Sequence, residues 1–164
     1  MKKKILFLMV AFLCAINANA QFEEGKVYVG GSLTGLNLSY NGSSDLNLGL
    51  QANVGYFFLD NLMLHGTVGY QHYGNDLLDD TFNVGVGGRY YITQNGIFLG
   101  ANCKWLHSEG FDDVMPGVEV GYAFFLSRTV TVEPSIYYQQ SFKDHKDYST
   151  IGLNIGVGLY LFKD

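Results

Sequence analysis

The sequence predicts an all-β protein, an eight-stranded antiparallel up-and-down transmembrane β-barrel. Eight segments alternate between apolar residues and small or polar ones with a period of two, which is the periodicity of a β-strand. The apolar face carries no Asp, Glu, Lys or Arg in any of them. Longer and tighter connections alternate between the segments, as they do in barrels built from membrane-crossing hairpins.

The first twenty residues have the organisation of a cleaved secretory signal peptide (1–20). Lys2 to Lys4 are basic, Ile5 to Ile16 form an apolar run, and Ala18-Asn19-Ala20 is a small-x-small cleavage site. Its removal takes three of the ten basic residues and none of the fifteen acidic ones, which leaves a formal net charge of −8. That charge argues against nucleic acid as a partner. Residues 21–164 are then expected to form one barrel domain with a single cysteine, Cys103.

The first four predicted strands span residues 26–40, 46–58, 62–73 and 81–92. In the first, the apolar positions change phase at Thr34-Gly35, which predicts a β-bulge. The second alternates without interruption from Leu46 to Phe58. The third encloses His65 and the fourth encloses Arg89, each among small and polar neighbours.

The last four predicted strands span residues 97–106, 114–126, 130–140 and 150–162. Asn95-Gly96, just before the first of them, is a strong signal for a hairpin turn. Pro134 cannot donate to a ladder, so we expect a bulge or a non-bonded position there. The final strand alternates cleanly and is expected to close the sheet onto the first.

The connections and the aromatic residues orient the barrel. The longer links (41–44, 74–80, 107–113 and 141–149) belong on the outer side, and the tight links (59–61, 93–95 and 127–129) on the periplasmic side, with both termini. Aromatic residues collect near both sets of links, which predicts a girdle at each membrane interface. They are Tyr56, Phe58, Tyr90, Tyr122, Phe124 and Phe162 near the tight links, and Tyr40, Tyr70, Trp105 and Tyr138 near the longer ones.

A water-soluble barrel of the lipocalin type is the alternative architecture, and the position of the charges argues against it. A soluble barrel places apolar residues inside and charges outside. Here the charges fall on the other face, among glycines and amides. A wholly apolar exterior on a soluble monomer would be an aggregation liability, whereas lipid requires one.

The chain resembles the small eight-stranded outer-membrane barrels of Gram-negative bacteria, of the OmpX and OmpA-barrel kind. The resemblance is carried by VYVGGSLTG, GVGGRYYI, VEVGYAFFL, VTVEPSIYYQ and GVGLYLF. It implies location in the bacterial outer membrane, contact with outer-membrane lipid and lipopolysaccharide, insertion by the barrel-assembly machinery, and a monomer. Barrels of this kind usually end on an outward-facing aromatic residue. This chain departs from that pattern, because Phe162 is out of phase with the outward face.

Four charged residues fall on the inward face of four consecutive predicted strands: Arg89, Lys104, Glu119 and Glu133. The interior of an eight-stranded barrel is just wide enough to be filled by side chains. We therefore expect these charges to pair with one another and with Tyr91, Tyr137 and His65, as a salt-bridged plug. The alternative is a gate or a narrow ion path.

The outer links are acidic, with Asp76, Asp79, Asp80, Asp112 and Asp113 among their residues. We interpret them as a solvated rim. The alternatives are a site for divalent cations that bridge lipopolysaccharide phosphates, and a surface for an extracellular ligand.

No catalytic, cofactor or metal site is predicted. His107-Ser108-Glu109 contains the residue types of a hydrolase, but three successive residues cannot converge as nucleophile, base and orienting group. The four histidines lack metal-ligand spacing. The sequence thus favours a non-enzymatic outer-membrane barrel with a structural or surface-interaction role. A narrow pore for ions or small solutes is the alternative, and a lipid-modifying enzyme is the less favoured third.

Overall fold

The computed structural model describes residues 22–36, 47–73, 81–92, 96–108, 111–142 and 149–161. The predicted signal peptide lies outside these ranges. The described strands are β1 (Val27–Leu36), β2 (Asn47–Leu59), β3 (Leu62–Tyr73), β4 (Thr81–Tyr91), β5 (Ile97–Ser108), β6 (Phe111–Tyr122), β7 (Phe124–Phe125), β8 (Val130–Gln139) and β9 (Thr150–Leu161). Within these ranges, no helix has the length and apolarity needed to cross a membrane.

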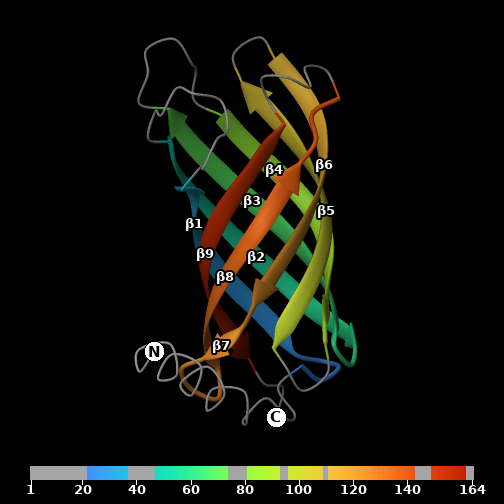
Figure 1. Cartoon of the computed structure of the whole chain (residues 1–164). Coiled ribbons are helices and arrows are strands. Elements are labelled where there is room, and N and C mark those ends of the chain that lie inside the picture. The colour runs from blue at the N-terminus through green and yellow to red at the C-terminus, as the bar shows by residue number, and fades with distance from the viewer. Residues whose placement is uncertain are drawn as a thin grey trace, which may run out of the picture.

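The strands form one antiparallel sheet that closes on itself (Figure 1). β6 and β7 are one strand interrupted at Ala123, because both pair with β8 in the same register. The barrel therefore has eight strands. β1 and β9 complete it, with Val27 opposite Leu161 and Leu33 opposite Ile155. The predicted fold class and the predicted closure of the last strand onto the first are confirmed.

The two faces of the sheet have the predicted polarity. Apolar side chains point outward and are exposed, among them Val54 (60%), Leu64 (59%) and Val86 (68%). Arg89 and Glu119 point inward and are buried. Because water is absent from the hydrocarbon of a bilayer, this exterior suits lipid and the closed ladder satisfies the backbone.

Both predicted irregularities are present. The register of β1 with β9 shifts between Thr34 and Leu36, where the phase change predicted a bulge. At Pro134, the pairing of β8 with β6 stops at Ser135 and the pairing with β7 begins at Val132. Pro134 thus lies in the interruption, where it has no N–H to donate to the neighbouring strand.

One predicted outer loop is wrong. Residues 107–113 were expected to form a long link, but β5 continues to Ser108 and β6 begins at Phe111. Asp112 pairs with His107, and Asp113 with Leu106, so both aspartates lie in β6 instead of a loop. The apolar alternation ends where the strands leave the hydrocarbon, while the backbone ladder needs no apolar side chains to continue. Asp76, Asp79 and Asp80 lie outside the described residues.

The sixth strand was predicted to be continuous over 114–126, but it is interrupted at Ala123, between β6 and β7. The amide of Ala123 donates to the carbonyl of Gly96 at 2.8 Å, which continues the register of β5 with β6 by one residue beyond the pair Ile97 and Tyr122. Gly96, from the predicted Asn95-Gly96 turn, has a φ of 69°. Asn95 itself is outside the described residues. The interruption at Ala123 therefore lies on the side of β8, between the pairs of Gly121 with Ser135 and Phe124 with Val132.

Exposed aromatic residues lie near both ends of the barrel. Tyr56, Tyr90 and Phe124 are exposed near the tight connections, and Tyr70 and Trp105 near the opposite end. Tyr40 and Phe162 are outside the described residues. The two positions fit interfacial girdles on a barrel that spans a bilayer.

The lipid-facing exterior makes a direct prediction for Val86, at the centre of β4. Val86→Arg should destabilise the folded protein by about 2 to 4 kcal/mol, because a charge in mid-bilayer is costly. Urea unfolding of the protein refolded into lipid vesicles measures this free energy.

The matched control is Leu126→Arg. Leu126 is as exposed as Val86 (70% against 68%) but lies in the turn after β7. Near the interface the same charge should cost only about 0 to 1 kcal/mol. Equal costs at the two positions would contradict the assignment of the β4 exterior to lipid.

Candidate functional site

The end of the lumen next to the tight turns is filled by aromatic side chains. Phe22 lies at the centre of the cluster, and its ring stacks on that of Tyr91 with a centroid separation of 4.1 Å. Phe125 and Tyr160 present their edges to Phe22 at 5.5 and 5.7 Å. The buried members are Phe22, Tyr28, Phe57, Met63, Tyr91, Phe98, Ala123 and Tyr160. These buried side chains, the aromatic layer, pack against one another at that end of the lumen.

Phe22 precedes β1 and is held in place by the β2–β3 turn. Its carbonyl accepts a hydrogen bond from the amide of Asn61 at 2.7 Å, and the amide of Gly25 donates to the carbonyl of Phe57 at 2.8 Å. Gly25 has a φ of 89°, a conformation that favours glycine. This role of Phe22 could not be predicted from the sequence, because a residue outside any alternating segment carries no periodicity to place it.

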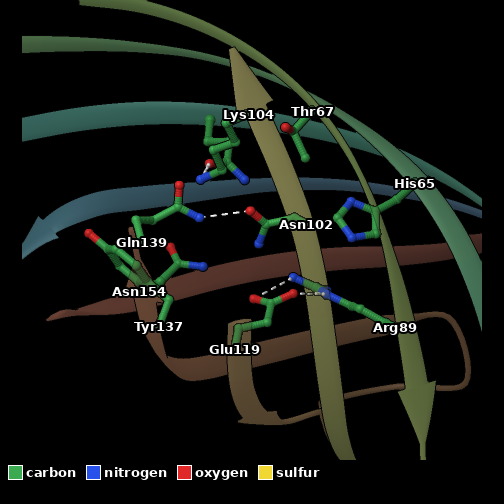
Figure 2. Close-up of a pocket in the computed structure, with 10 residues that line it drawn as sticks. His65, Thr67, Arg89, Asn102, Lys104, Glu119, Tyr137, Gln139 and Asn154 are labelled. Atoms are coloured by element: carbon green, nitrogen blue, oxygen red, sulfur yellow. Dashed lines mark hydrogen bonds and ion pairs between the residues drawn. The ribbon is translucent and has the colours of Figure 1, made fainter. Parts of the chain in front are cut away.

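An ion-pair layer lies directly on the aromatic layer, and Arg89 is its centre. Arg89 Nε donates to Glu119 Oε1 at 2.6 Å, and Nη2 donates to Glu119 Oε2 at 3.3 Å (Figure 2). Nη1 donates to Glu133 Oε2 at 2.9 Å. The guanidinium carbon is 4.5 Å from the centre of the Phe98 ring, a cation–π contact that joins the two layers.

The carboxylate of Glu133 is buried, and both of its oxygens accept hydrogen bonds. Besides Arg89, it accepts hydrogen bonds from Tyr28 Oη at 2.9 Å, Thr131 Oγ1 at 2.7 Å and Tyr160 Oη at 2.9 Å. A buried charge is tolerated only when such partners replace its water. The rings of Tyr28 and Tyr160 thus belong to the aromatic layer, and their hydroxyls donate to the ion-pair layer.

Glycines on the inward face give these long side chains their room. Arg89, Gly100 and Glu119 form one row across β4, β5 and β6. A Cβ on Gly100 would lie 2.5 Å from Cγ of Glu119, so only glycine lets that carboxylate cross the lumen to Arg89. A Cβ on Gly87 would lie 2.8 Å from Nε2 of His65.

Lys104 does not join the ion pairs. Its ammonium donates to Gln51 Oε1 at 3.1 Å and is 5.9 Å from the ring centre of Tyr137. In the described part of the chain, no carboxylate oxygen lies within 4.0 Å of it. The register explains this, because Lys104 is four residues along β5 from Gly100, about 13 Å at a rise of about 3.3 Å per residue.

A small cavity lies beside the ion pairs, between Arg89 and Lys104 (Figure 2). Its volume is about 20 Å³. The lining residues are Gln51, His65, Thr67, Arg89, Asn102, Lys104, Glu119, Tyr137, Gln139 and Asn154. Both ring nitrogens of His65 and the hydroxyl of Thr67 lack a hydrogen-bond partner among the described residues.

The remaining candidates do not assemble a catalytic or metal site. His107 Nδ1 is 2.6 Å from Asp112 Oδ1, with both side chains more than half exposed. Asp113 is buried and accepts from the amide of Val114 and from Ser141 Oγ. Glu109 lies outside the described residues. Cys103 is exposed on the outward face. Among the residues described, no group of three His, Cys, Asp or Glu side chains could hold a metal ion.

Comparisons with known proteins find likeness in structure and none in sequence. No protein-family model matches the chain, and no curated protein matches its sequence.

Among solved structures, the N-terminal β-barrel domain of Pseudomonas aeruginosa OprF is similar, with a TM-score of 0.62, 12% identity, and coverage of 84% of this chain and 98% of that one. Yersinia pestis Ail has a TM-score of 0.59, 15% identity, and coverage of 84% and 100%. Neisserial surface protein A has a TM-score of 0.56 and 19% identity, with coverage of 83% of this chain and 99% of that one. Together with the apolar exterior, this likeness shows that the chain has the fold of the small eight-stranded outer-membrane β-barrels of Gram-negative bacteria.

Proposed function

We propose that the protein is a non-enzymatic outer-membrane barrel whose lumen is closed to ions and solutes, and that it acts through its structure and its outer surface. The observation that carries this proposal is the bridge from Arg89 to Glu119 and Glu133, laid across the lumen on top of the aromatic layer. A conducting path would have to pass both layers.

The outer end supports a role at the surface. Beyond Trp105, which is placed to mark the interface, β5 and β6 continue as a hairpin with His107 and Asp112 exposed. This hairpin carries polar side chains past the membrane boundary, where lipopolysaccharide or an extracellular ligand would meet them. Insertion by the barrel-assembly machinery and a monomeric state belong to the same proposal.

A lipid-modifying enzyme finds no support in the geometry. His107 contacts Asp112 on the neighbouring strand, a histidine–carboxylate pair without a hydroxyl or thiol nucleophile in contact among the described residues. The buried Ser141 contacts Asp113, which points into the barrel while His107 points out. The serine and histidine therefore lie on opposite faces of the sheet.

The closed lumen predicts an electrically silent protein. Folded protein reconstituted into planar bilayers should give no discrete conductance steps, because the aromatic layer and the ion-pair layer leave no continuous water path. Heat-modifiable gel migration shows that the barrel is folded, and a general porin in the same bilayers shows that steps are detectable.

Stable steps from the folded protein that change when Arg89 or Glu119 is neutralised would overturn the proposal in favour of a narrow pore. Conductance steps that neither substitution changes would place the conducting path elsewhere. They would also contradict the proposal of a closed lumen.

The ion-pair layer also predicts a large effect of Arg89 on stability. Arg89→Met leaves two buried carboxylates without their cation, so the free energy of unfolding in lipid vesicles should fall by about 3 to 5 kcal/mol. Arg128→Met is the control, because Arg128 is exposed in the turn after β7 and its loss should cost no more than about 0.5 kcal/mol. Comparable losses from the two variants would show that Arg89 does not hold the layer together.

A further inference from the structure

We propose that the cavity between Arg89 and Lys104 binds a single monoatomic anion of the chloride class. The inference concerns the interior of the barrel and is independent of whether the lumen conducts.

The first argument is the surplus of hydrogen-bond donors around the cavity. An ammonium has three donors and a guanidinium five. Lys104 directs one to Gln51, and Arg89 directs three to its two carboxylates. Arg89 also hydrogen-bonds to the side chain of Tyr91. The two other donors of Lys104 have no acceptor among the described residues, and the hydroxyl of Thr67 and the ring of His65 add to them. A water molecule accepts only about two hydrogen bonds, whereas an anion accepts from several donors at once.

The second argument is burial. His65 is 7% exposed and Thr67 is 3% exposed, yet neither has a hydrogen-bond partner among the described residues. A buried polar group without a partner destabilises the fold, so groups of this kind around one space indicate that something occupies it.

The third argument is the distribution of charge. Both carboxylate oxygens of Glu119 are turned toward Arg89, and Glu133 lies on the far side of Arg89 among tyrosine hydroxyls. Lys104 therefore faces the cavity without a carboxylate in contact, in the part of the chain that the structure describes. Lys104 is thus the positively charged group at the cavity wall that has no carboxylate in direct contact among the described residues.

One lining acceptor, Asn154 Oδ1, is also without a partner in the described residues. Its Nδ2 contacts Ser135 Oγ at 3.4 Å. Because a serine hydroxyl donates as well as accepts, the amide can turn over, keep Ser135 as its partner and direct Nδ2 to the cavity. Asn154 thus adapts to an anion.

The size of the cavity selects the class of ligand. About 20 Å³ exceeds the roughly 10 to 15 Å³ that holds one water molecule. It admits one halide ion, which is only slightly larger than water, and excludes phosphate, sulfate and carboxylates.

Bromide gives the direct test. Crystals of the intact protein grown with sodium bromide in place of sodium chloride should show an anomalous difference peak in the cavity, within reach of Lys104 Nζ and Thr67 Oγ1. The peak should be absent in Lys104→Met and present in Arg128→Met, which removes one exposed positive charge elsewhere.

A second measurement covers the case in which Lys104→Met does not fold. Thermal unfolding at constant ionic strength, with chloride replaced stepwise by gluconate, should show a saturable rise of the midpoint with chloride. In Thr67→Val, which keeps the shape of the side chain, the chloride concentration at half-saturation should rise by about tenfold or more, the equivalent of one lost hydrogen bond to a charge.

A cavity that contains water only would overturn the proposal. In the crystals grown with bromide, the cavity would then contain ordered solvent without an anomalous signal. In the unfolding measurement, the midpoints would be the same in chloride and in gluconate. An anomalous peak that persists unchanged in Lys104→Met would overturn it as well.

Discussion

The absence of water from the bilayer core is the constraint on which the rest of this structure depends. A strand exposed to hydrocarbon can satisfy its backbone only through neighbouring strands, so the sheet must close. Closure occurs between β1 and β9. With eight strands, the enclosed space is so narrow that side chains fill most of it. The outside is therefore selected for apolarity, and the inside for a set of side chains that fit one another.

The interior meets this requirement by layers. Large aromatic rings fill the end at the tight turns, and Arg89 lies on them through Phe98. The carboxylates of Glu119 and Glu133 then neutralise the guanidinium across the lumen. Glycines opposite the long side chains, such as Gly100, provide the space. Small and large residues alternate across neighbouring strands, as Gly100 does between Arg89 and Glu119.

The period-two pattern was enough to predict the strand number, the orientation of the two faces, the closure, and the irregularity at Thr34. The missing N–H of proline predicted the irregularity at Pro134. The period-two pattern also identified Arg89, Glu119 and Glu133 as inward. It was not enough to separate Lys104 from the ion pairs, because that depends on the register between β5 and β6. The predicted end of β5 was also too early. Apolar alternation is limited to the part of a strand within the membrane, whereas the backbone ladder extends beyond it. The position of Phe22 in the lumen was not predicted, because this residue lies outside any strand.

The central claim is that Arg89 and its two carboxylates act as one unit that closes the lumen. A double-mutant cycle between Arg89→Met and Glu119→Gln, measured as free energies of unfolding in lipid vesicles, tests it most directly. The account predicts a coupling free energy in the upper part of the range of about 0.5 to 3 kcal/mol that contacting residues show. Additive effects, with a coupling below about 0.5 kcal/mol, would contradict it.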